Sequence, residues 1–150
     1  MNTTARGTPS GTAALLGFGG LIPFVGLALA SWFVPAPYRS DVLHALATYA
    51  ATIASFVGAL HWGAAMHRDD VDPARLLAWG VVPSLVAWLA LLANAASALL
   101  ILAALLMLCF GVDRVVYPRL GLAEWLPMRL RLTAVAVISC MAAALASVAF

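Results

Sequence analysis

Runs of apolar residues recur along this chain, and each is long enough to cross a lipid bilayer. Of its 150 residues, 65% are hydrophobic and only 9% are charged, whereas soluble domains contain about 25% charged residues. A helix needs about 20 apolar residues to span the hydrocarbon layer. No soluble core of this length could bury so much apolar surface. The sequence therefore predicts an all-α, polytopic membrane protein.

Breaks in the apolar pattern divide the chain into a bundle of five transmembrane helices. Two prolines predict a short loop over residues 34–41, and Asn94 with Ser97 predicts a tight hairpin. A segment over 117–129 mixes Pro, Gly, Trp and charges, so we expect it to lie at the headgroups. The expected spans are 13–34, 42–67, 76–93, 97–116 and 131–149, which together form one transmembrane domain over 13–150 after a disordered cytoplasmic tail over 1–12.

Two prolines lie inside expected spans, Pro23 in the first and Pro83 in the third, and each follows a glycine by three residues. Proline removes a backbone donor and clashes with the preceding turn. The freed backbone groups survive in a membrane only where neighbouring helices cover them. We therefore expect a kink or local break in the first span, and bends at both sites that face other helices.

All eight basic residues are arginine, and their distribution predicts the orientation. With five spans, only Arg39 lies on the side opposite the N-terminus, and basic residues favour the cytoplasmic side. The N-terminus is therefore expected in the cytoplasm and the C-terminus in the periplasm, in a bacterial inner membrane. The absence of lysine excludes retinal and pyridoxal Schiff bases and a phosphate-binding P-loop. The other seven arginines are Arg6, Arg68, Arg75, Arg114, Arg119, Arg129 and Arg131.

One side of the second span carries small residues around a histidine. Small residues let a neighbouring backbone approach closely in a membrane, so this face should point into the bundle. His61 would then contact protein, either as a structural link between helices or as part of a functional site. We expect a neutral ring that meets a hydroxyl, a carbonyl or an Arg-paired acid, namely Asp113 if the fourth span is adjacent. The face comprises Ala47, Ala50, Ala54, Gly58, His61 and Ala65.

Charged residues converge on the connection between the fourth and fifth spans and predict a binding site at the cytoplasmic side. Arginine near the inner headgroups can bind anionic lipids or a partner's carboxylates. The simpler interpretation is positive-inside topology with one Asp–Arg pair. We predict no catalytic residue, cofactor or metal; no second histidine is placed to complete a haem site, and no acid lies at mid-membrane for coupled transport. The candidate lipid or partner site comprises His61, Trp62, Asp113, Arg114, Arg129 and Arg131.

Several short motifs resemble a bacterial membrane family of unknown function that includes the mitochondrial transmembrane protein 69. They are LGFGGLIPF over 16–24, SFVGALHWG over 55–63, VVPSLVAW over 81–88 and LRLT over 130–133. The resemblance covers the chain after residue 12 and implies a small polytopic protein of inner or mitochondrial membranes. It implies no reaction, substrate or cofactor.

These observations favour a protein that acts by binding, not catalysis. A chain with so little soluble surface must meet its partners within the bilayer. We expect an accessory or assembly subunit of a larger membrane complex, in contact with membrane lipids and with no nucleic-acid partner. The alternative is a small membrane enzyme or carrier that binds a lipid or quinone at the cytoplasmic face.

Overall fold

The computed structural model describes residues 9–67 and 73–149, and nearly all of them are helical. The elements in chain order are α1 (Gly11–Gly19), α2 (Leu21–Phe33), α3 (Ala36–His67), α4 (Pro73–Ala90), α5 (Ala95–Arg119), the short 3-10 helix η1 (Ala123–Trp125) and α6 (Leu126–Ala149). Five stretches are long and apolar enough to span a membrane: α1 with α2, α3, α4, α5, and η1 with α6. The predicted all-α fold with five spans is thereby confirmed for the described residues.

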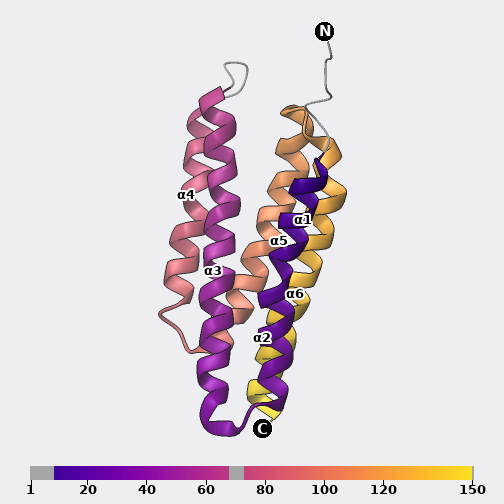
Figure 1. Cartoon of the computed structure of the whole chain (residues 1–150). Coiled ribbons are helices and arrows are strands. Elements are labelled where there is room, and N and C mark those ends of the chain that lie inside the picture. Colours follow the sequence, from indigo (N-terminus) through magenta and orange to yellow (C-terminus); the bar gives the residue numbers. More distant parts are fainter. Residues whose placement is uncertain (1–8, 68–72, 150) are drawn as a thin grey trace.

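The five spans run alternately up and down in one bundle, as Figure 1 shows. α3 packs against α2, α4, α5 and α6, while α4 lies at the edge of the bundle against α3 and α5. The starts of α1, α4 and α6 and the ends of α3 and α5 share one end of the bundle, here called the N-terminal end. The arginine distribution predicts that this end faces the cytoplasm, and that orientation stays a prediction.

Side-chain caps explain two of the helix starts. Asn94 precedes α5, and its Oδ1 accepts a hydrogen bond from the Ser97 backbone N–H at 3.0 Å. Ser10 caps α1 in the same way through Ala13. Such caps satisfy backbone donors that the first helical turn leaves free. The hairpin predicted at Asn94 and Ser97 is confirmed, whereas most of the tail predicted over 1–12 lies outside the described residues and α1 already begins at Gly11.

Three predicted boundaries are wrong. The loop expected over 34–41 is mostly helix, because α3 begins at Ala36 and holds Pro37 in its first turn, where a missing N–H costs no hydrogen bond. The third span occupies Pro73–Ala90 instead of 76–93, with a proline as its first residue. The fourth and fifth spans extend beyond 97–116 and 131–149, because α5 ends at Arg119 and α6 begins at Leu126; the expected headgroup depth of 117–129 stays a prediction. Only a short connection through Gly121, with φ of 69°, and η1 separates α5 from α6.

The first span breaks at Gly20, between α1 and α2. Pro23 has no N–H to offer the carbonyl one turn earlier, which favours a break in the helix at this point. The Tyr49 hydroxyl of α3 donates a hydrogen bond to the Gly20 carbonyl at 2.7 Å. A neighbouring helix thus satisfies a backbone group at the break, as a membrane requires. The predicted break in this span is confirmed.

The small-residue face of α3 forms the centre of the bundle. Five of its six residues, from Ala47 to His61, are buried, and only Ala65 is partly exposed. α4 approaches this face so closely that a Cβ at Gly58 would lie 2.5 Å from the Gly80 carbonyl oxygen. Pro83 is buried against Gly58. The predicted direction of this face is confirmed, as is the expectation that Pro83 faces another helix.

Candidate functional site

A buried ion pair joins α5 to α6 near the N-terminal end of the bundle. The Asp113 side chain is fully buried, and its Oδ2 accepts hydrogen bonds from Arg129 Nε at 2.9 Å and Nη2 at 2.7 Å. The Arg129 side chain is 12% exposed. A carboxylate is stable at such a depth only when a cation and hydrogen bonds compensate its charge. The predicted Asp–Arg pair is therefore Asp113 with Arg129.

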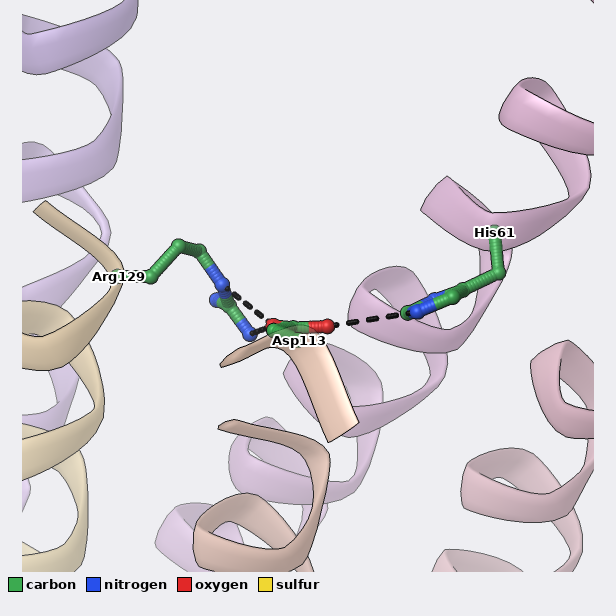
Figure 2. Close-up of polar contacts among 3 residues, drawn as sticks. All are labelled: His61, Asp113 and Arg129. Carbon is green, nitrogen blue, oxygen red and sulfur yellow. Dashed lines mark hydrogen bonds and ion pairs between the residues drawn. The ribbon is translucent and has the colours of Figure 1, made fainter. Parts of the chain in front are cut away.

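His61 of α3 completes the group, and we call His61, Asp113 and Arg129 the polar trio (Figure 2). His61 Nε2 lies 3.4 Å from Asp113 Oδ1, and its side chain is 1% exposed. This separation is longer than that of a good N–H···O hydrogen bond, so the contact is electrostatic. The predicted contact between His61 and Asp113 is confirmed. The trio ties together three helices.

Local sequence explains why these side chains meet. His61 and Asp113 each lie six residues before the last residue of their helix, His67 and Arg119. At about 1.5 Å per residue, both lie about 9 Å below the helix ends. Arg129 lies three residues after the start of α6. Because α5 and α6 are antiparallel and joined by a short connection, the long Arg129 side chain can reach Asp113 from the first turn of α6.

His61 Nε2 faces Asp113 Oδ1, but neither of these atoms has a hydrogen-bond partner among the described residues, and the same holds for His61 Nδ1. Arg129 already compensates the charge of Asp113 through Oδ2, so the His61 ring lies against an ion pair that is neutral as a whole.

A pocket of about 240 Å³ lies beside His61, between α3, α5 and the connection to α6. Its volume is several times the ~30 Å³ that one water occupies in the liquid. The Tyr117 ring forms part of the wall, with its centroid 6.3 Å from that of His61. Trp125 Nε1 is buried and also lacks a hydrogen-bond partner within the described ranges. This His61 pocket is lined by Leu60, His61, Ala64, Tyr117, Leu120, Leu122 and Trp125.

The structure brings together three of the six predicted site residues and separates the rest. The indole of Trp62 is turned toward α4, where Nε1 donates a hydrogen bond to the Leu77 carbonyl at 2.9 Å. Its ring covers Gly80, so Trp62 holds α3 to α4. Arg114 and Arg131 are exposed and contribute nothing to the His61 pocket.

Tyr117 and Trp125 line the pocket, and sequence reasoning did not select them. Tyr117 follows Asp113 by four residues and therefore lies on the same face of α5. In the sequence, this four-residue spacing from Asp113 was the one feature that could have identified Tyr117 as a site residue. Trp125 lies in η1, within a segment that composition alone assigned to the headgroups. Its place in the pocket depends on how the connection folds back over α3.

The arrangement can hold an uncharged polar group in an apolar setting. The pocket offers mostly hydrocarbon and aromatic surface, with His61 and Trp125 as its nitrogen-bearing side chains. No cluster of three or more His, Cys, Asp or Glu side chains that could hold a metal ion occurs in the part of the chain that the structure describes. Cys109 and Cys140 are buried free thiols.

Five apolar spans around a buried polar trio define a multi-pass membrane protein. The chain belongs to the family described as protein of unknown function DUF3429, which matches residues 9–145. It is 42% identical over 84 residues to transmembrane protein 69 of Xenopus tropicalis, in an alignment that covers 53% of this chain and 32% of that relative. The aligned region is thus about a third of that relative's length. No solved structure matches the chain.

Proposed function

We propose that the protein binds a membrane-soluble amphiphile, a lipid or a quinone, in the His61 pocket. The observation that carries the proposal is the mostly apolar pocket of about 240 Å³, to which two elements each contribute one nitrogen-bearing side chain, His61 from α3 and Trp125 from η1. Concave, mostly apolar pockets with a few polar groups are typical of small-molecule sites.

The position of the pocket suits a ligand that arrives through the bilayer. His61 lies about 9 Å below the end of α3, which is near the depth where lipid headgroups give way to acyl chains. The surrounding helices expose large apolar side chains such as Leu60 and Val115. An acyl or isoprenoid chain can therefore remain in lipid while its head enters the pocket. The arginine distribution predicts that this entry lies in the cytoplasmic leaflet.

Binding fits the trio better than catalysis does. Arg129 neutralises the Asp113 carboxylate, and Asp113 in turn lies 3.4 Å from His61 Nε2. The acid beside His61 is thus already paired with a cation. We therefore assign the trio to holding and orienting a ligand.

Native mass spectrometry of the full chain, extracted in a mild detergent, tests the proposal. Ala64 lines the pocket, and Ala59 lies on the exposed side of the same helix. We expect the wild-type protein to retain an amphiphile, Ala64→Phe to lose it by filling the pocket, and the matched control Ala59→Phe to retain it. Equal retention by both variants, or no amphiphile on the wild-type protein, contradicts the proposal.

A second function, that of a subunit in a larger membrane complex, is favoured by a groove on the outer side of α3 and α4. The groove holds about 230 Å³ and is lined mainly by small and hydroxyl side chains. Such residues favour close packing of another transmembrane helix. The Thr52 hydroxyl donates a hydrogen bond to the Thr48 carbonyl of its own helix at 3.0 Å. A partner helix would therefore bind this groove through close packing and not through the Thr52 hydroxyl. A stoichiometric protein in the same mass spectra, lost in Thr52→Leu, supports this function.

A further inference from the structure

We infer that a second groove of the bundle, separate from the His61 pocket, holds one acyl chain of a glycerophospholipid, whose ester carbonyl accepts a hydrogen bond from the Thr133 hydroxyl. The groove encloses about 150 Å³ where α1 and α2 lie against α6 (Figure 1). Among the described residues, it shares no lining residue with the His61 pocket. This Thr133 groove has walls that include Leu16, Gly20, Phe24, Phe56, Leu132 and Thr133.

Thr133 supplies a hydrogen-bond donor to the groove. Its side chain is 8% exposed, and its hydroxyl makes no hydrogen bond with any residue that the structure describes. The hydroxyls of Thr48 and Ser55, by contrast, donate to carbonyls of their own helix. Unlike the ring nitrogens of His61, the Thr133 oxygen is not fully enclosed by protein atoms, so a ligand atom in the groove can reach it. A hydroxyl can donate whatever the protonation of its neighbours.

The depth of Thr133 matches the ester groups of a lipid. Arg131 lies two residues earlier in α6 and is exposed, so its charged end must reach the headgroups. At about 1.5 Å per residue, Thr133 lies about 3 Å further into the bilayer. This is the level at which headgroups give way to acyl chains, and the ester carbonyls of glycerophospholipids lie there.

The rest of the groove suits hydrocarbon. Its walls are mainly aliphatic and aromatic, and Gly17 and Gly20 contribute no side chain to fill it. An apolar cavity of about 150 Å³ in another protein binds benzene, so the groove can take a short stretch of chain. Leu16 and Phe56 at its walls are 69% and 62% exposed on the outer surface of the bundle. The remainder of the lipid can therefore stay in the bilayer.

The charges beside the groove favour an uncharged ester over a fatty-acid carboxylate. Arg129 also lines the groove, but its Nε and Nη2 are directed at Asp113 Oδ2. A carboxylate would place a second anion next to a cation that Asp113 already neutralises. An ester carbonyl accepts a hydrogen bond from Thr133 without that penalty.

Titrations of the full-length protein, freed of lipid in a mild detergent and followed by native mass spectrometry, test the inference. The probes are dioleoyl phosphatidylcholine, its dialkyl ether analogue without ester carbonyls, and oleate. We expect the wild-type protein to bind the ester lipid about fivefold more tightly than the ether lipid, because one hydrogen bond is lost. Oleate should bind more weakly than the ester lipid.

Matched variants assign that preference to one hydroxyl. Thr133→Val removes the hydroxyl and keeps the branched shape, so it should bind the ester and ether lipids equally. Thr48→Val is its control, because the Thr48 hydroxyl is bonded within its own helix and does not line the groove. It should keep the fivefold preference. The melting temperature of each variant in detergent checks that it is folded.

A phosphatidylcholine with a photoreactive diazirine in one acyl chain locates the bound lipid. Crosslinks should form at Phe24 and Val57, which line the groove and are almost fully buried from the surrounding lipid. Ala64→Phe fills the other pocket and should leave the ester preference unchanged. Crosslinks confined to Leu60 and Leu122, or a preference lost in Ala64→Phe, would place the lipid in the His61 pocket and overturn this inference while the proposed function stands.

The wild-type titrations can also refute the inference without any variant. Equal affinity for the ester and ether lipids would exclude the hydrogen bond to the carbonyl. Tighter binding of oleate would show that the groove takes a fatty acid instead. Either result leaves the proposed ligand of the His61 pocket unaffected.

Discussion

Removing Arg129 should destabilise the bundle far more than removing a neighbouring arginine. Arg129→Met leaves the Asp113 carboxylate fully buried and without its cation, while His61 remains 3.4 Å away. Two charge-assisted hydrogen bonds are lost, at about 1.5–3 kcal/mol each. Removal of one partner of a buried ion pair lowers the free energy of unfolding by about 3–5 kcal/mol in soluble proteins. We expect a loss of about 3–5 kcal/mol in the free energy of unfolding.

The two partners of the pair should not be equivalent. Asp113→Asn leaves a cation on Arg129, whose side chain is already 12% exposed and long enough to turn its head toward the interface. Asp113 is fully buried and its short side chain cannot reach water. Asp113→Asn should therefore cost about 1–3 kcal/mol, the usual penalty for unmatched polar groups. The double variant Asp113→Asn with Arg129→Met should be more stable than Arg129→Met alone.

Unfolding in mixed micelles with increasing sodium dodecyl sulfate, followed by tryptophan fluorescence, measures these differences. Arg131→Met is the matched control, because Arg131 lies two residues further along α6 and is exposed. It should change stability by no more than about 0.5 kcal/mol. Equal losses for Arg129→Met and Arg131→Met would refute the reasoning. So would a double variant as unstable as the sum of its single changes.

The packing and the charge distribution lead to three further predictions. Gly58→Ala should cost more than about 2 kcal/mol by forcing α3 and α4 apart, whereas Gly111→Ala, where nothing lies within 4 Å of an added Cβ, should be neutral or slightly stabilising in the same unfolding assay. Tyr49→Phe should lower stability by about 1 kcal/mol and increase hydrogen exchange around Gly20, because it removes a 2.7 Å hydrogen bond at the break; unchanged exchange there argues against that role. A phosphatase reporter fused after Phe150 should be active only in the periplasm, and cytoplasmic localisation of the fusion would overturn the orientation.

Sequence alone predicts the spans well, because membrane thickness constrains them. An apolar run either reaches across the hydrocarbon or does not, so five spans follow from length and composition. The boundaries were less predictable where proline begins a helix. Pro37 reads as a loop signal, yet proline is tolerated in the first turn of a helix, where the N–H is unpaired.

The sequence predicts the contact between His61 and Asp113, but it does not predict the positions of Trp62 and Trp125. His61 and Asp113 are polar groups within apolar helices, so burial and pairing are almost obligatory. Trp62, by contrast, could have faced either the trio or α4, and only the close approach at Gly80 places it against α4. The role of Trp125 depends on the fold of a short connection, which no periodicity describes.

The shared ion pair of α5 and α6 also has a consequence for biogenesis. Asp113 is synthesised sixteen residues before Arg129, so α5 leaves the ribosome with an acid whose cation has not yet been made. A helix with an unpaired carboxylate below the headgroups partitions into lipid less favourably than the same helix with its partner beside it. We therefore expect the insertion machinery to release α5 and α6 together as a helical hairpin. Nascent chains truncated before Arg129 should hold α5 at the translocon, and an Asp113→Leu change should release it early.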